Sequence, residues 1–264
     1  LEFRRVLFRS MKSSPIPFIV SLLALFLFFN ACRRMLVACA PLLLQKSVFS
    51  QTTYGFMSSL TSILFGVVRF GAFFLMKRFP LDTYVCVTSV IACSVCAAMC
   101  LFSSDSSSFY MIGFALLSMS IALPFPCSSS VIQHSIDPSY QSLLFSLLAV
   151  TSNLGSVAST QLMYSFQSPS RVFGLLAQFG AACAMAFYVF YPEESKEKKE
   201  ESKSVSLSPR KNETLRLSLC FLAQFLIYLT RRIISEWSSV YLPKLFPLSS
   251  EASIALFTHA STAF

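Results

Sequence analysis

The decapeptide YLTRRIISEW, residues 228–237, places two adjacent arginines inside an otherwise apolar run of the sequence. A second stretch, NACRRM at residues 30–35, repeats the arrangement: a polar or aromatic residue, two small or apolar residues, two arginines and an apolar continuation. Two copies of one pattern at this distance predict an internally duplicated membrane protein. A cation in the middle of a membrane helix costs roughly 2.5–3.5 kcal/mol on insertion scales, so arginines there usually face a cavity and mark a pathway.

The composition of the 264-residue chain excludes an ordinary soluble domain. Hydrophobic residues make up 55% of the sequence, charged residues only 12%, and the mean hydropathy is +0.64. Soluble domains carry about one quarter charged residues, whereas a membrane helix needs about 20 mostly apolar residues. Runs of that length recur along the whole sequence, which predicts an all-α membrane protein with many spans.

The nine cysteines lie almost entirely inside apolar runs, where cysteine behaves as a small hydrophobic residue. Cys93, Cys96 and Cys100 share one helix face, but both histidines are far away and no fourth ligand is evident, so packing is favoured over a metal site. No constellation of His, Asp or Cys has catalytic spacing. We therefore expect no metal, no cofactor and no enzymatic activity.

The sequence divides into four segments. Residues 1–10 resemble a translated sequencing-adapter scar ahead of a plausible start at Met11. Residues 11–191 form a six-helix bundle, residues 192–214 a charged linker, and residues 215–264 a seventh span and part of an eighth, so we expect a fragment of a longer protein. The six spans are predicted at residues 16–44, 55–76, 81–102, 109–132, 141–164 and 172–191.

Two details of these spans need comment. The first run could instead be a cleaved signal peptide, but its apolar pattern continues past the arginines. It is expected to close near Pro41. Pro124 and Pro126 should break the regularity of the fourth span, which is tolerated where the freed backbone groups face protein or a cavity.

Basic residues in the short loops predict the orientation in the membrane. Lys12, the Lys77–Arg78 turn and the linker fall on one side if the spans alternate, whereas Lys46, Arg171 and Lys244 fall on the other. The N-terminus and the linker are therefore predicted to be cytoplasmic. Two parallel halves related by an axis along the membrane normal would place Arg33 and Arg231 across one central cavity.

Helix spacing separates the two arginines of the second pair. Arg232 and Glu236 are four residues apart and can form an ion pair on one helix face, whereas Arg231 points elsewhere. No acid lies within helical reach of Arg33 or Arg34, so spacing alone cannot choose between them. Together with Arg69, these cations exceed the counter-charge in the spans, and arginine binds phosphate or carboxylate bidentately. The alternative is that they reach the interface or bind lipid headgroups.

Several short motifs occur in the order and spacing of one known family. They are Arg33 with Pro41; Gly55-Phe56, Ser58-Ser59, Gly66 and Arg69-Phe70; Pro126-Cys127; Asp137-Pro138-Ser139; Asn153-Leu154-Gly155; and Tyr228, Arg231, Glu236-Trp237 and Tyr241-Leu242. The chain thereby resembles the organophosphate:phosphate antiporters of the major facilitator superfamily. These include bacterial glycerol-3-phosphate transporters and the endoplasmic-reticulum glucose-6-phosphate translocase.

The resemblance implies a major facilitator fold, here the six-helix N-terminal bundle and the first one or two helices of the C-terminal bundle. It implies exchange of a sugar phosphate or glycerol phosphate for inorganic phosphate by alternating access. Arg33 and Arg231 would bind the phosphate, and Arg69, Tyr228 and Asn153 would support them. The expected partners are these small anions and the lipid bilayer, without nucleic acid. The endoplasmic reticulum or another internal membrane is favoured, with the plasma membrane as the alternative.

The chain also departs from the family pattern. Lys77, beside Arg78, replaces an acid that helps to latch one state, and Ser152 replaces a substrate-contacting histidine of bacterial relatives. Pro124 and Leu148 stand where those relatives have tryptophans. Two alternatives therefore stay open: an anion sensor or scaffold that no longer cycles, and a facilitator for another organic anion such as a carboxylate.

Overall fold

The computed structural model describes residues 16–75, 81–102, 106–135 and 138–191, and two helical positions beyond them, Leu219 and Ala223. The chain divides into two compact units, residues 1–196 and 197–264. The seven helices that follow all lie in the first unit: α2 (Ile16–Gln45), α3 (Gln51–Leu75), α4 (Leu81–Leu101), α5 (Ser107–Ala122), α6 (Pro124–Ser135), α7 (Pro138–Phe166) and α8 (Pro169–Phe190).

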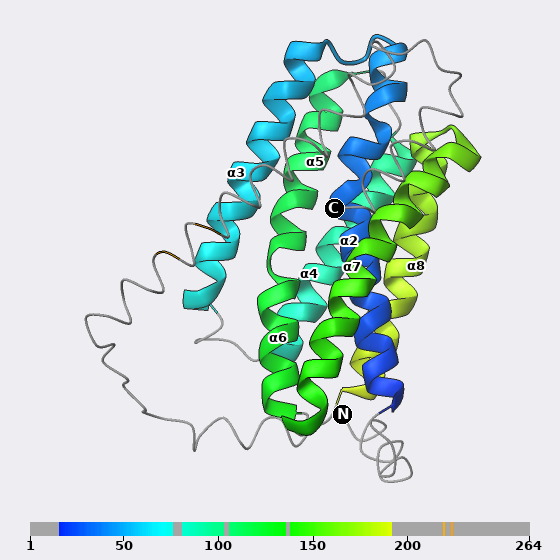
Figure 1. The fold of residues 1–264 in the computed structure, drawn as a ribbon. Helices are drawn as coiled ribbons and strands as arrows, with labels where there is room; N and C mark the ends of the chain where they lie inside the picture. The colour runs from blue at the N-terminus through cyan, green and yellow to red at the C-terminus, as the bar shows by residue number, and fades with distance from the viewer. Residues whose placement is uncertain are drawn as a thin grey trace. The chain divides into compact units, whose positions relative to one another are not determined.

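These helices provide six stretches that are long and apolar enough to cross a membrane, the fourth of which runs through both α5 and α6. They alternate in direction: α2 runs from the bottom of the view to the top, α3 returns, and α4, α5 with α6, α7 and α8 continue the alternation (Figure 1). The start of α2 and the end of α8 therefore lie at the same end of the bundle. The predicted all-α architecture with its first six spans is confirmed.

Three helices begin a few residues before the apolar runs that predicted them. α3 begins directly after Ser50, whose Oγ accepts a hydrogen bond of 3.0 Å from the backbone N–H of Thr53 and so caps the helix. α7 begins at Pro138 and α8 at Pro169. Proline suits a first helical position because its fixed φ is already helical and its missing N–H would have no partner there.

Helix α2 contains Pro41 and continues past it to Gln45, one residue beyond the predicted end of the first span at residue 44. Membrane helices tolerate an internal proline because neighbouring groups satisfy the freed carbonyl. The helix ends instead in a Schellman motif. The Val48 N–H donates to the Leu43 carbonyl at 3.0 Å, and the Ser47 N–H donates to the Leu44 carbonyl at 3.1 Å. Ser47 has a φ of 57°, the left-handed conformation that glycine usually supplies.

The fourth span is interrupted, as the prolines predict. α5 ends at Ala122, Leu123 separates the two helices, and α6 begins at Pro124. Leu123 keeps helical angles, with φ −80° and ψ −36°, so the chain continues in nearly the same direction. The break arises because a proline inside a helix cannot donate the backbone hydrogen bond. It brings Phe125 to the first turn of α6.

Helix α2 lies at the centre of the bundle. Half of its apolar window is buried within the protein, against 22% in α3 and 22% in α7. It packs mainly on α7 and α8, while α4 packs on α8 and α5. Helix α3 packs chiefly on α5 and touches α2 and α6 at few points. The arginine pair of the first span therefore sits on the most enclosed helix of the described part.

Candidate functional site

Arg33 extends from α2 over an aromatic ring of the neighbouring helix α3. Its guanidinium carbon Cζ lies 4.4 Å from the centroid of the Phe65 ring, within the range of a cation–π interaction. The Arg33 side chain is half-buried. Arg33 lies roughly 18 Å from the nearer end of α2 at 1.5 Å per residue, and half of the hydrocarbon core is about 15 Å. Arg33 therefore lies in the middle part of α2, away from both of its ends.

Arg69 lies on α3, one helical turn after Phe65, and contacts two rings. Its Cζ lies 5.7 Å from the centroid of Phe65 and 4.6 Å from the centroid of Phe125 on α6. Phe125 in turn packs against Phe26 of α2, with ring centroids 5.9 Å apart and an interplanar angle of 42°. These five residues, Arg33, Phe65, Arg69, Phe125 and Phe26, are called the aromatic ladder below. It joins α2, α3 and α6.

The ladder brings two cationic side chains close to one another. The side chains that the structure describes include five cationic residues and no aspartate or glutamate. The Cζ atoms of Arg33 and Arg69 both lie within 5.7 Å of the centroid of the Phe65 ring. Two unit charges about 10 Å apart repel by roughly 1.7 kcal/mol at an effective dielectric constant of about 20, and an anion about 4 Å from one of them gains roughly 4 kcal/mol. A bound anion would therefore remove a repulsion as well as add an attraction.

A polar contact between α2 and α7 lies one turn before the arginine pair. The Asn30 amide is buried and donates from Nδ2 to the Phe26 carbonyl at 2.8 Å, while its Oδ1 accepts from Ser152 Oγ at 2.9 Å. Gly155, one turn further along α7, lets the two helices approach closely. A Cβ added at Gly155 would lie 2.8 Å from Asn30 Cβ and 2.9 Å from the Leu27 carbonyl oxygen. The backbone that carries Arg33 is therefore held firmly against α7.

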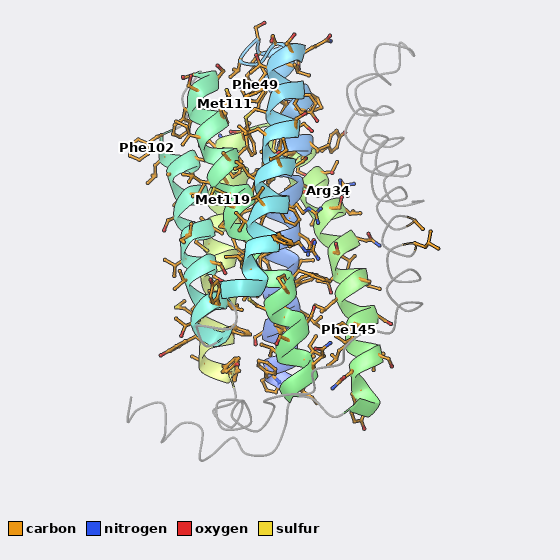
Figure 2. The ribbon with its side chains drawn as sticks, turned by 90° about the vertical axis from the view of Figure 1, so that its left-hand side faces the viewer. Arg34, Phe49, Phe102, Met111, Met119 and Phe145 are labelled. Carbon is orange, nitrogen blue, oxygen red and sulfur yellow. The ribbon has the colours of Figure 1, made fainter. Side chains whose placement is uncertain are left out.

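The structure brings together two of the predicted substrate residues, Arg33 and Arg69. Asn153 is exposed on α7, next to the serine that bonds to Asn30. Arg34 is half-buried, and Figure 2 places it between the two ends of the bundle, which Phe49 and Phe145 mark. The remaining predicted residues lie outside the described residues: Tyr228, Arg231, Arg232 and Glu236.

Phe65 and Phe125 were not anticipated from the sequence. The spacing of Phe65 and Arg69 is i, i+4, which places the two side chains on one helix face and could have been noticed. Nothing in the sequence connects Phe125 to Arg69, because that contact depends on how α6 packs beside α3.

The cysteines of the described helices contact one another and their apolar neighbours. Cys32 Sγ lies 3.8 Å from Cys96 Sγ, and Cys39 Sγ lies 3.7 Å from Met163 Sδ. Cys93, Cys96 and Cys100 share a face of α4, as the sequence suggests. Within the described ranges, no group of three or more His, Cys, Asp or Glu side chains could hold a metal ion.

Comparison with known proteins identifies the superfamily. Residues 18–264 match the Major Facilitator Superfamily. The chain belongs to this superfamily. With six membrane-length helices in its described part, this Major Facilitator Superfamily chain is an integral multi-pass membrane protein.

No curated protein matches the chain. Among solved structures, it is similar to the crystal structure of an auto-inhibited peptide transporter of the POT family, with 19% sequence identity and a TM-score of 0.49. The similarity covers 90% of this chain and 52% of that one, so this Major Facilitator Superfamily chain spans about half the length of that transporter.

Proposed function

We propose that this protein is a secondary transporter that exchanges a phosphorylated metabolite, a sugar phosphate or glycerol phosphate, for inorganic phosphate. Arg33 of the first span and Arg231 of the seventh bind the phosphate as the two halves alternate in access. Arg69, Tyr228 and Asn153 support them, and Arg232 pairs with Glu236. The protein resides in an internal membrane such as the endoplasmic reticulum, with its N-terminus and the linker in the cytoplasm.

The observation that carries this proposal is the pairing of Arg33 and Arg69 around the single ring of Phe65. It brings two permanent positive charges, one on α2 and one on α3, beside the same ring. Arginine supplies planar, in-plane N–H donors that match the oxygens of a phosphate group.

The same observation distinguishes Arg33 from Arg34. Adjacent helical residues point about 100° apart, and it is Arg33 that stacks on the helix α3 ring beside Arg69. The choice of Arg33 from the family motif therefore agrees with a contact that is independent of the motif. This agreement supports Arg33 as the phosphate ligand of the first span.

Exchange of labelled phosphate by the full-length protein in liposomes tests the proposal. Removing one partner of a desolvated charged pair costs about 2–5 kcal/mol, so Arg33→Ala and Arg231→Ala should each lower exchange by at least roughly 30-fold. Arg171→Ala is the matched control, because Arg171 is an exposed arginine in the first turn of α8. It should exchange like the unmodified protein.

Three outcomes are decisive. Exchange that persists in both Arg33→Ala and Arg231→Ala overturns the assignment of these residues. Stabilisation by phosphate without any flux indicates a sensor of the same fold. Competition by a simple carboxylate that equals competition by phosphate indicates a carrier for another organic anion.

A further inference from the structure

We propose that Cys32 of α2 and Cys96 of α4 form a dithiol site that captures a neutral compound of trivalent arsenic by bridging the two sulfurs. The site uses none of the residues of the aromatic ladder. The inference is independent of the proposed exchange, because it concerns a covalent adduct of two cysteines and is measured by binding rather than by transport.

The two thiols are close together and enclosed by the protein. Their Sγ atoms lie 3.8 Å apart, and the exposed fractions of the side chains are 2% for Cys32 and 0% for Cys96. Cys39, which is also buried on α2, instead contacts Met163 Sδ of α7 at 3.7 Å. Cys32 and Cys96 therefore differ from a single packed cysteine, because they place two nucleophilic sulfurs from different helices side by side.

Helix α8 fixes the separation of these two sulfurs. Both α2 and α4 pack on α8. At Gly180 of α8 an added Cβ would lie 2.8 Å from Cys93 Sγ of α4 and would also meet the ring of Phe28 of α2. Phe28 lies one helical turn before Cys32, and Cys93 lies one turn before Cys96. The three helices thus meet tightly beside the thiol pair, which is already arranged for a bridging atom.

The sulfur separation selects the kind of atom that can bridge the pair. A bond of about 2.3 Å to each sulfur, the length of a zinc–thiolate bond, would span the 3.8 Å gap with an angle of about 110° at the bridging atom. A tetrahedral zinc ion would need four ligands, and the described ranges hold no group of three or more His, Cys, Asp or Glu side chains that could bind one. Pyramidal trivalent arsenic needs only two sulfurs, because its third substituent is its own.

The capture reaction is balanced without an oxidant. An arsenical of the class R–As=O forms one S–As bond with each thiol, and both thiol protons leave with the oxygen as one water molecule. Arsenic stays trivalent, and the reactant and the adduct are both uncharged. The adduct therefore adds no charge to an apolar interior, where an unpaired charge is costly. The same cost excludes thiol reagents that carry a permanent charge.

The test measures binding of phenylarsine oxide to the purified full-length protein by intact-mass spectrometry. We expect one adduct per chain that survives washing with a monothiol and is released by a dithiol. Two linked sulfurs bind about 10²–10⁴ times more tightly than one, so Cys32→Ala and Cys96→Ala should each weaken binding by about 10²-fold or more. Cys39→Ala is the matched control and should bind like the unmodified protein, because Cys39 is equally buried on the same helix.

Two outcomes overturn the inference: an adduct that persists in both Cys32→Ala and Cys96→Ala, and an adduct of the unmodified protein that the monothiol removes. If the alanine variants do not fold, the unmodified protein still decides the question. After capture it is unfolded in the presence of an alkylating reagent. Cys32 and Cys96 should both escape alkylation while Cys39 is alkylated, and alkylation of Cys32 or Cys96 contradicts the bridge.

Discussion

Gly155 is the position where a single methyl group should disturb the support of the anion site most directly. An added Cβ would lie 2.8 Å from Asn30 Cβ, 2.9 Å from the Leu27 carbonyl oxygen and 3.0 Å from the Ala31 backbone nitrogen. Two of these atoms belong to the backbone of α2, so they cannot yield by rotating a side chain. Gly155→Ala must therefore push α7 and α2 apart in the turn that precedes Arg33.

The magnitude follows from two opposing terms. Overpacking a close contact costs about 1–3 kcal/mol, whereas replacing a helical glycine by alanine gains about 0.8–1.0 kcal/mol in helix propensity. Gly71→Ala in α3 isolates the second term, because a Cβ there would meet nothing within 4 Å. The difference between the two variants should therefore equal the packing term alone. In a domain of 150–250 residues, 1 kcal/mol changes the melting temperature by about 2–4 °C.

Thermal unfolding of the two variants in the same detergent measures this difference. We expect Gly155→Ala to unfold roughly 2–12 °C below Gly71→Ala, and Gly71→Ala to be at least as stable as the unmodified protein. A Gly155→Ala protein that is as stable as Gly71→Ala would show that α2 and α7 are not in close backbone contact. The account of how Arg33 is supported would then be wrong.

Two further predictions concern contacts near the same helix. Ser152→Ala removes the hydrogen-bond donor to Asn30 Oδ1. Because hydrogen bonds between membrane helices average about 0.6 kcal/mol, a double-mutant cycle with Asn30→Ala should give a coupling energy of that size. A coupling energy of zero contradicts the hydrogen bond. Ser47→Gly should raise the free energy of unfolding by about 1 kcal/mol, because Ser47 has a left-handed φ of 57° that glycine adopts without strain. Thermal unfolding measures this increase in stability. Ser47→Ala is the control, because alanine relieves no strain and should not increase the stability.

Most of the fold of the first unit follows from the periodicity and length of apolar runs. Those signals miss the starts of α3, α7 and α8 by a few residues, because a span was expected to begin where its apolar pattern begins. α7 and α8 instead begin at Pro138 and Pro169, whose fixed φ favours a first helical position. The end of the first span was predicted within one residue, although Pro41 lies inside α2, because in a membrane protein neighbouring groups satisfy the carbonyl that a proline frees.

Only part of the candidate site could be predicted from the sequence. Arginines in apolar runs indicate a site because an unneeded charge is costly in lipid. This reasoning pointed to Arg33, Arg34 and Arg69, and the family motif then favoured Arg33 over Arg34. It could not select the rings, because phenylalanine is common in every span and only packing decides which ring lies under which cation. Phe65 has a local signal in its i, i+4 spacing to Arg69, whereas the contact of Phe125 with Arg69 depends on the arrangement of α3 and α6.

Helix α2 contacts α7 and α3 in two physically different ways, and this difference affects how easily each helix could move against α2. Toward α7 it has close backbone packing at Gly155 and a directional hydrogen bond through Asn30, both of which are lost after small displacements. Toward α3 it has the cation–ring contact of Arg33 with Phe65 at 4.4 Å, which is less directional and tolerates sliding of the ring under the cation. Movement of α3 against α2 would therefore cost less than movement of α7 against α2. Such an arrangement keeps the Arg33 backbone fixed against α7 while α3 is freer to shift.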